Sequence, residues 1–459
     1  MDYKEDYTDL VDFFEGERQV KEKGERYTPR LEGQKHKNDA YDTYKNMGIL
    51  FNSLARTRQG LKGAILRKPI DIQFPESQKE ALDDVMLNGA SFEDLTREVC
   101  DLILGFGRNG VLVDVDSLEM PYAAIYGPLS IFEYPEIRRK GVKQEILLYE
   151  EIKIVDEDDE TKEKTVPQRR KLELDESGYY MVTLYRKGEG TSDDWVPIES
   201  TKEAPNPKWP VYKGKKLDFI PFTFFGSSSN VPEPSKPPLL DLLNILKGHW
   251  RLTVSYQYGL HFAGLPTPCF AGFDFEDGET IALGPGAVHH TPHPDANSWF
   301  LQTGGSGLGD MEKGLDRLEV QMATVGARLL EGQRAGVEAA ETVRLRSSGD
   351  TATLSDIAGN VEAGLTDVLQ YIGFWLGVPA KDCQVSVNKD FVSTRLGPQD
   401  ITALLGAVQA GQISEETFIY NLIQGEITQD GKTVEDEMED IAENKLKNSR
   451  TAPNLDGIV

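Results

Sequence analysis

Cysteine, histidine and long apolar runs are all scarce in this chain of 459 residues. Its three cysteines, Cys100, Cys269 and Cys383, lie far apart and are odd in number. This argues against a disulfide framework or a zinc ribbon and favours a reducing cytosol. No apolar run reaches the roughly 18 residues that a membrane-spanning helix needs. Residues 1–6 are mostly charged or polar, so they do not resemble the apolar centre of a signal peptide.

Basic residues are also in the minority. The chain carries 50 lysines and arginines against 76 aspartates and glutamates, which gives a net charge of −26. Such a chain is expected to be soluble, because like charges keep copies apart. It is not expected to grip DNA through a broad basic face, since that mode of binding rests on many phosphate contacts.

The usual catalytic signatures are missing. The sequence contains no G-x-x-x-x-G-K-[ST], no H-E-x-x-H and no G-x-S-x-G motif. Residues 105–110 do match G-x-G-x-x-G, but they follow a helical pattern over residues 80–104 and precede a strand-like run over residues 111–115. A dinucleotide site has the opposite order, strand then helix. We therefore interpret these glycines as a helix-to-strand turn.

Metal ligands are poorly arranged. The acidic run over residues 156–160 lacks the spacing and the glycine of an EF-hand loop, so we interpret it as a solvated hairpin tip. A second group joins three histidines to nearby acids in a proline-rich segment: His289, His290, His293, Asp274, Glu276 and Asp295. Nothing in this spacing indicates convergent ligands. We expect no catalytic residue, cofactor or metal, although a cytosolic enzyme with a loop-assembled site around the histidines remains an alternative.

Three long helices organise the middle of the chain. Apolar residues recur every three or four positions over residues 239–262, 308–331 and 354–376, the spacing of a helix with one apolar face. Thr353 and Asp356 suit a capping box at the start of the third helix, and Gly377 suits its end. The first two helices are separated by short strand-like pieces over residues 265–305. The second and third are separated by a polar, glycine-containing segment, residues 332–350, which we expect to be a loop.

The flanking regions complete a predicted α+β fold. We expect an exposed arm or mobile helix over residues 1–34, and a β-rich region over residues 122–218. A Ser/Pro-rich linker over residues 226–238 is a candidate subdomain boundary. After the third helix, residues 384–388 alternate like a strand. Three short helices are then predicted over residues 401–408, 415–424 and 434–446, and a mobile tail over residues 448–459.

Several short motifs, taken in their order and spacing, resemble those of phage portal proteins. The closer resemblance is to a portal-like family of tailed phages known as a domain of unknown function. The motifs are residues 52–63 with Arg67-Lys68-Pro69, residues 107–114, Ile220-Pro221-Phe222, residues 237–241, 264–267 and 281–284, the helix from Gly307, Glu341-Thr342, Leu354-Ser355 and residues 388–391. The resemblance covers about residues 41–391 and is weaker in the N-terminal arm and beyond residue 397.

The resemblance implies a fold with named parts. Residues 1–236, with the N-terminal arm, correspond to an α/β wing. Two stem helices follow, residues 237–262 and 307–331, with a small β-containing clip between them over residues 263–306. Residues 332–350 correspond to a tunnel loop. Residues 351–396 supply a long helix from wing to crown and a strand returning to the wing, and residues 397–459 a helical crown with a C-terminal tail.

The resemblance also implies a function. Portal proteins form rings of usually twelve subunits at one vertex of the capsid, and double-stranded DNA passes through them during packaging and ejection without sequence-specific contacts. The expected partners are the large terminase, then an adaptor or head-completion protein, the major capsid protein and scaffold. The expected location is the virion, with assembly in the host cytoplasm and no membrane association. Such a protein carries no catalysis. Another head-tail connector or minor capsid protein is the nearest alternative.

Two sets of candidate site residues follow from the resemblance. The tunnel-loop set would face DNA and consists of Arg334, Glu341, Thr342, Arg344, Arg346, Ser347 and Ser348. The clip set would face docking partners and consists of Phe270, Asp274, Glu276, His289, His290, His293 and Trp299. The arginines are expected to make local phosphate contacts within a mostly acidic channel.

Overall fold

The fold is described from a computed structural model. It describes residues 3–35, 38–116, 119–133, 145–155, 163–187, 194–202, 204–265, 267–273, 290–301, 306–330, 340–389, 398–424, 427–428 and 433–450. These residues form a mixture of helices and antiparallel sheets, so the predicted α+β class is confirmed. The chain divides into two compact units. The main unit comprises Met1–Glu331 and Ala339–Lys389, and the C-terminal unit comprises Gly332–Glu338 and Asp390–Val459.

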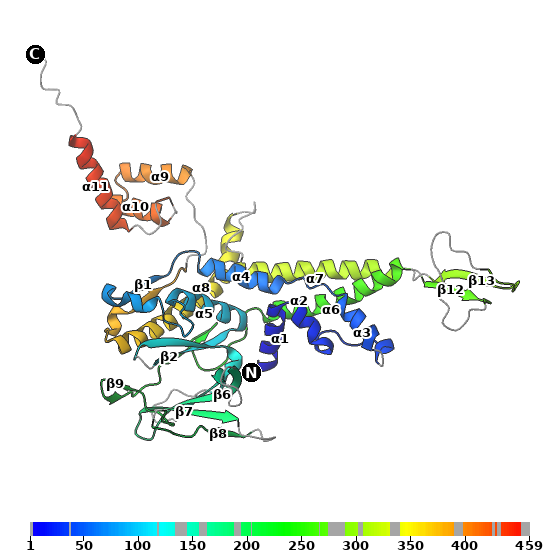
Figure 1. The fold of residues 1–459 in the computed structure, drawn as a ribbon. Coiled ribbons are helices and arrows are strands. Elements are labelled where there is room, and N and C mark those ends of the chain that lie inside the picture. The colour runs from blue at the N-terminus through cyan, green and yellow to red at the C-terminus, as the bar shows by residue number, and fades with distance from the viewer. Residues whose placement is uncertain are drawn as a thin grey trace, which may run out of the picture. The chain divides into compact units, whose positions relative to one another are not determined.

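Helix α8 (Ala340–Leu376) is the centre of the main unit (Figure 1). The apolar residues that repeat along it are all buried within the subunit: Leu354, Ile357, Val361, Leu365, Val368, Ile372 and Trp375. Gly364 lets the helix approach the neighbouring sheet, because a Cβ there would lie 2.4 Å from the ring of Phe225. The helix ends at Gly377, whose φ of +79° suits glycine.

The three-stranded sheet beneath α8 has the order β11-β2-β3 and consists of Phe222–Gly226, Arg108–Val115 and Pro121–Tyr126. Helix α5 (Phe92–Phe106) leads into β2 through Gly107, whose φ is +73°. Gly110 faces the ring of Phe222, and a Cβ there would lie 2.2 Å from it. The glycine motif is therefore a helix-to-strand turn, as predicted, with its glycines serving backbone conformation and packing.

A second, five-stranded antiparallel sheet has the order β4-β5-β6-β7-β8. Its strands are Ile131–Glu133, Glu145–Val155, Glu163–Leu174, Tyr180–Lys187 and Trp195–Pro197. The β-rich prediction for this region is confirmed. The acidic run between β5 and β6 lies outside the described residues.

Charged side chains that are buried or half-buried join the two sheets. Glu150 on β5 accepts hydrogen bonds from Tyr126 on β3 at 2.5 Å and from Arg170 on β6 at 2.6 Å. Arg170 also lies 3.6 Å from Asp114 on β2. Burial lowers the pKa of Arg170, but the surrounding tyrosines and Glu150 outweigh it, so the pKa of its guanidinium is raised and the group stays charged.

A short strand pair joins two segments of the main unit that lie far apart in the sequence. Strand β1 (Asp71–Gln73) pairs antiparallel with β14 (Gln384–Ser386), which follows α8. Strand β14 was predicted from alternation, and the pairing brings the chain after α8 back to its N-terminal part. A separate small hairpin joins β9 (Val211–Tyr212) to β10 (Lys215–Lys216), and Tyr212 packs its ring 4.8 Å from Phe374 of α8.

The predicted exposed arm at the N-terminus is wrong. Helices α1 (Lys4–Glu15) and α2 (Glu17–Glu22) pack into the main unit, where Leu10 and Phe13 are fully buried. The prediction failed because the segment is strongly charged. Two of those charges are buried in a network, since Tyr27 donates hydrogen bonds to Asp9 at 2.9 Å and to Asp12 at 2.6 Å.

The predicted subdomain boundary over residues 226–238 is also wrong, because this segment lies inside the main unit. The buried guanidinium of Arg108 donates a hydrogen bond to the carbonyl of Pro232 at 2.7 Å. The Asn360 side chain of α8 donates to the carbonyl of Gly226 at 3.0 Å. Polar side chains of the folded body therefore satisfy the backbone of a segment whose composition is typical of a linker.

The C-terminal unit holds the three helices that were predicted there. They are α9 (Pro398–Gln409), α10 (Glu415–Gln424) and α11 (Val434–Arg450). Thr433 accepts a hydrogen bond from the backbone N–H of Asp436 at 3.1 Å, and its own N–H donates to the Asp436 carboxylate, which forms a capping box for α11. The mobile tail predicted over residues 448–459 is wrong for residues 448–450, which continue α11, and residues 451–459 lie outside the described residues.

Candidate functional site

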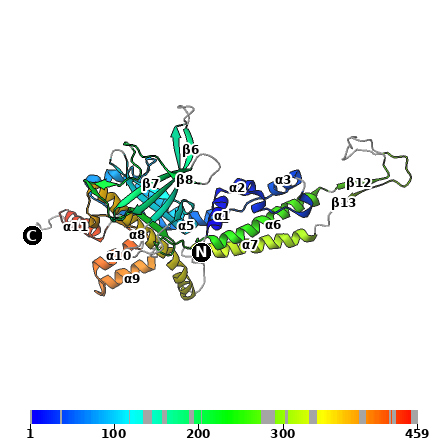
Figure 2. The ribbon, with the colours of Figure 1, turned by 90° about the horizontal axis from the view of Figure 1, so that it is seen from below.

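Two long helices form an arm of the main unit. Helices α6 (Leu240–Gly264) and α7 (Ser306–Leu330) lie side by side and lead away from the two sheets (Figures 1 and 2). Both agree with their predicted bounds to within two residues. Glycines bring the helices close, because a Cβ at Gly259 would lie 2.8 Å from Leu308, and one at Gly314 would lie 3.0 Å from Leu252.

The base of this arm is fixed by the N-terminal helices and the segment after them. Trp250 of α6 is fully buried and donates a hydrogen bond to the hydroxyl of Thr28 at 2.9 Å. A Cβ at Gly48 would lie 2.5 Å from the Trp250 ring. Lys247 forms an ion pair with Asp9. Burial raises the pKa of the Asp9 carboxyl, but hydrogen bonds from Lys247, Arg26 and Tyr27 outweigh it, so its pKa lies below the ordinary value.

Burial falls along the arm. At its base Leu246 and Val254 are fully buried, whereas near the far end Leu260 and Phe262 are 39% and 44% exposed. Helix α7 buries only Met322 of its apolar face among the residues whose side chains are described, and the rest of that face is half-buried or exposed: Leu308, Met311, Leu315, Leu318 and Val325. A single copy therefore leaves apolar surface on this arm uncovered.

The arm ends in a two-stranded antiparallel ribbon. Strand β12 (Thr267–Ala271) pairs with β13 (Asn297–Leu301), with Cys269 opposite Trp299 and Pro268 opposite Phe300. Trp299 and Phe300 are 46% and 63% exposed. A ribbon of two strands is only marginally stable by itself, so exposed aromatic side chains here suit a surface that packs against something else.

The predicted clip residues are only partly brought together. Phe270 lies on β12 and packs its ring 5.3 Å from Phe273, while Trp299 faces solvent on β13. His290 and His293 are exposed in the segment leading to β13. Three further members of this set lie outside the described residues: Asp274, Glu276 and His289. Within the part of the chain that the structure describes, no group of histidine, cysteine and acidic side chains could hold a metal ion.

The predicted tunnel loop is wrong over its second half. Residues 340–350 form the first turns of α8, so the helix begins well before the predicted cap at Thr353. The prediction gave too much weight to glycine and serine and too little to the helix-forming alanine, glutamate, leucine and arginine residues between them. Six of the seven candidates lie on this helix: Glu341, Thr342, Arg344, Arg346, Ser347 and Ser348. Arg334 lies outside the described residues.

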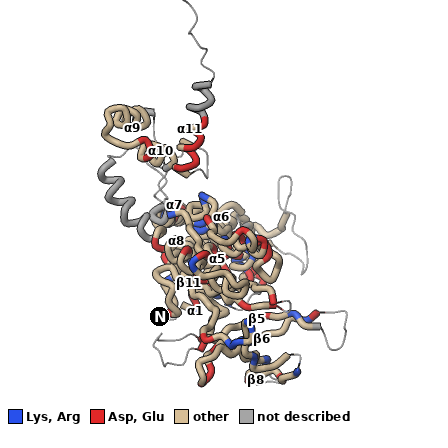
Figure 3. The backbone as a smooth tube through the Cα atoms, turned by 90° about the vertical axis from the view of Figure 1, so that its left-hand side faces the viewer, with Lys and Arg blue, Asp and Glu red and all other residues tan. Residues whose placement is uncertain are grey.

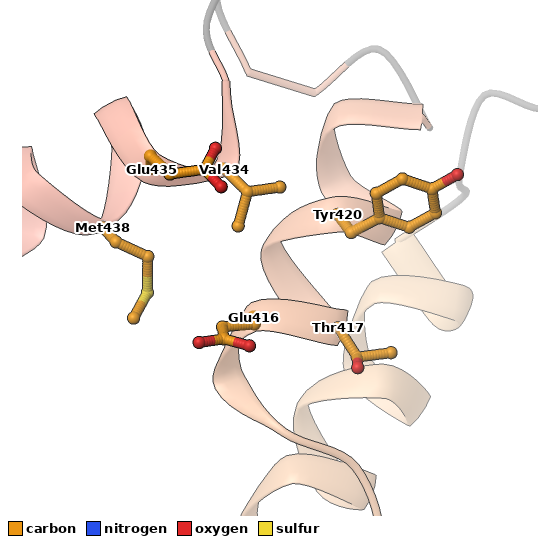
Figure 4. A pocket seen from close by; sticks show the side chains of 6 residues that line it. All are labelled: Glu416, Thr417, Tyr420, Val434, Glu435 and Met438. Atoms are coloured by element: carbon orange, nitrogen blue, oxygen red, sulfur yellow. The ribbon is translucent and has the colours of Figure 1, made fainter.

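The C-terminal unit contains a groove that the sequence analysis missed. It lies between α10 and α11 and has a volume of about 550 Å³ (Figure 4). Helix α10 contributes Glu416, Thr417 and Tyr420, and α11 contributes Val434, Glu435 and Met438. The sequence does show that both helices have acidic residues in their first turns. One of these residues in each helix, Glu416 and Glu435, lines the groove. Nothing in the sequence placed the two helix starts opposite each other.

None of the described helices is both long and apolar enough to span a bilayer. Acidic residues occur in the first turns of α10 and α11 (Figure 3).

One family model matches the chain. It is described as "Domain of unknown function (DUF4055)" and covers residues 238–376, which is less than a third of the sequence. The matched range runs from α6 through the ribbon and α7 to the end of α8. No protein with a curated description matches the sequence.

Three solved structures show distant likenesses to this chain. A chain from the "Virion of native gene transfer agent (GTA) particle" has a TM-score of 0.40 and 11% identity, covering 82% of this chain and 91% of its own. A chain from the "Neck of empty GTA particle computed with C6 symmetry" has a TM-score of 0.38 and 10% identity, with coverages of 84% and 93%. One from the "Neck of native GTA particle computed with C12 symmetry" has a TM-score of 0.38 and 11% identity, with coverages of 83% and 92%. TM-scores of this size do not establish a common fold.

Proposed function

We propose that this chain is the portal protein of a tailed phage or a phage-like particle. Its copies form a ring, of twelve subunits, at one vertex of the capsid, and DNA passes through the central channel during packaging and ejection. A portal protein is one kind of structural protein of the head-tail connection, so the proposal includes that broader role. The protein itself performs no chemical step.

One observation carries the proposal most directly. The paired helices α6 and α7 leave the body side by side, hold a small β-ribbon between them, and lead on to the long helix α8. The sequence resemblance assigns this order of elements to a stem, a clip and a wing-to-crown helix. The apolar surface that α6 and α7 leave uncovered supports assembly, since such surface on a soluble protein usually meets a partner. A ring of identical copies would cover the same patch on every subunit.

The charge of the chain supports a channel that does not hold DNA. Twelve copies at −26 each carry a net charge of −312. Acidic walls repel phosphates, whereas each lysine or arginine contact would add affinity that slows sliding. Local contacts would then fall to Arg334, Arg344 and Arg346, which belong to the segment at the start of α8 or just before it.

Partners follow from the same assignment. The large terminase would dock on the ribbon, where Trp299 and Phe300 present aromatic surface. The adaptor or head-completion protein would take the same place once packaging ends. The major capsid protein and scaffold would meet the part of the main unit formed by the two sheets.

Electron microscopy of the purified full chain, together with native mass measurement, tests the proposal. Twelve copies of a 51.2 kDa chain give a ring of about 614 kDa with a central hole. Monomers or small closed oligomers without a hole, at every salt concentration tried, would contradict it. Replacing His290 and His293 with alanine should leave ring formation intact, whereas an enzyme built around these histidines would lose its activity.

A further inference from the structure

The described side chains of the C-terminal unit form very little core. Among its described side chains, Ile419 is the one large apolar residue that is buried, while Leu405, Tyr420 and Ile427 are 44%, 54% and 48% exposed. A unit of this size normally relies on a shared core, a metal or a partner for stability. Its helices therefore need a covering surface from outside the unit.

The groove between α10 and α11 offers a specific place for that cover. Tyr420, Val434 and Met438 are its apolar lining residues, and Glu416 and Glu435 are its acidic ones (Figure 4). Neither carboxylate has a hydrogen-bond or ion-pair partner in the described part of the chain. The complementary occupant is a segment that combines positive charge with aliphatic side chains.

Helix α11 carries such a segment at its own far end. Its first turn contains Glu435, Asp436 and Glu437, whereas its sequence ends with Lys445, Leu446, Lys447 and Arg450. The basic end cannot fold back into the groove of its own chain. At about 1.5 Å per residue, Lys445 stands about 15 Å along the helix axis from Glu435. The basic end that meets the groove must therefore come from another copy.

We propose that the groove between α10 and α11 binds the basic end of α11 from the neighbouring subunit. This inference rests on the proposed ring and deepens it. The contact joins two different patches, an acidic groove and a basic helix end, which is the head-to-tail arrangement that closes into a ring. It also brings counter-charges to Glu416 and Glu435. DNA is a poor alternative occupant, because the two carboxylates would repel its phosphates.

Reversing charges in full-length chains tests the contact. The groove variant carries Glu416→Lys and Glu435→Lys, and the helix-end variant carries Lys445→Glu and Lys447→Glu. Each variant alone places like charges at every contact. Rings of either one should therefore dissociate at protein concentrations about tenfold higher than wild-type rings do, as native mass measurement can follow.

Mixing the two variants is the decisive step. In an alternating ring, every basic groove meets an acidic helix end and every acidic groove meets a basic helix end. Mixed rings should therefore regain wild-type stability and contain the two variants in equal numbers, which mass differences between the chains reveal. A control with the same charge change outside the groove lining, Glu415→Lys with Glu439→Lys, should not be rescued by mixing with the helix-end variant.

The acidic start and basic end of α11 would also suit its own macrodipole, within one chain. On that explanation each variant loses helix stability by itself, and mixing rescues nothing. This result, or rings unaffected by either variant, would overturn the inference while leaving the ring proposal intact. Wild-type chains that never form rings would overturn both.

Discussion

Helices α7 and α8 share one sequence pattern and differ in how deeply they are buried. Both repeat apolar residues every three or four positions, and either one would be predicted as a core helix. In α8 the repeated residues from Leu354 onward are all buried. In α7, Met322 is the one repeated residue that is buried among the side chains described, and Val320 is 66% exposed.

The difference arises from what surrounds each helix. Helix α8 is packed by the three-stranded sheet, by α5 and by β14, so its apolar face meets neighbours along most of its length. Within the described part of the chain, the main neighbours of helix α7 are α6, α4 (Ser53–Ile65) and α8. A periodic pattern thus identifies which face is apolar, but not whether the same chain or another copy covers it.

The largest expected effect is the loss of stability when a fully buried leucine of α8 is truncated. Leu365→Ala in α8 should lower the free energy of unfolding by about 2–5 kcal/mol, because the side chain is fully buried and its loss leaves a cavity. Leu315→Ala in α7 removes the same atoms from a half-buried site and should cost less than half as much. Urea denaturation at concentrations where subunits are separate measures both.

Equal losses for the two leucine variants would mean that α7 is as well covered in one subunit as α8, and the comparison would fail. In assembled rings the order should change. Leu315→Ala should then lower ring stability more than it lowers the stability of the separate subunit.

Most elements of the fold were predictable because each depends on local spacing. The three long helices, strand β14 and the helix-to-strand turn at Gly107 all followed from periodicity and glycine placement. The N-terminal helices did not, because Asp9 and Asp12 are buried through partners distant in sequence. Charge marks a segment as exposed only when no such partner exists, and a sequence does not reveal one.

The sequence predicted the order of helices and strands that form the candidate site. It predicted far less well where the individual side chains of that site lie. The helix–ribbon–helix order was predicted, and Trp299 lies on that ribbon with 46% of its surface exposed. The start of α8 was missed because scattered glycine and serine residues outweighed the helix formers near Arg344. The groove at Glu416 and Glu435 depends on two helix starts meeting in space, which no local pattern reports.

Two glycines of α8 should respond differently to alanine, with smaller effects on stability. Gly364→Ala places a Cβ 2.4 Å from the Phe225 ring and should cost about 1–3 kcal/mol through overpacking. Gly359→Ala on the same helix meets nothing within 4 Å and should instead stabilise by up to about 1 kcal/mol, since alanine favours helix. Thermal denaturation should give opposite signs. Matching signs would show that packing on Phe225 does not control this face.

Acid should weaken the base of the arm before it weakens α8, whose contacts are apolar. Asp9 has a lowered pKa in the folded state, so it stabilises the fold above the ordinary pKa of 3.8, and this stabilisation is lost as pH falls through its folded value. Asp9→Asn should cost about 1–3 kcal/mol at pH near 6, because Lys247 loses its partner. The difference from wild type should shrink towards about pH 3.

Urea denaturation at both pH values measures this change. Glu5→Gln, at an exposed position of the same helix, is the matched control and should show little difference from wild type at either pH. A loss at Asp9 that is constant with pH would mean that the side chain acts through shape and hydrogen bonding alone, with no contribution from its charge.

The smallest expected effect on the subunit is the most informative about assembly. Val320→Ser on α7 should change the free energy of unfolding by no more than about 0.5 kcal/mol, because the side chain already faces solvent. If neighbouring copies cover α7, the same change should raise the concentration at which rings dissociate. Gln321→Ala, about 100° further around the helix, is the control for a change elsewhere on it. Rings that tolerate Val320→Ser unchanged would put this position on a free surface of the assembly, and the uncovered face of α7 would then extend only over its half-buried residues.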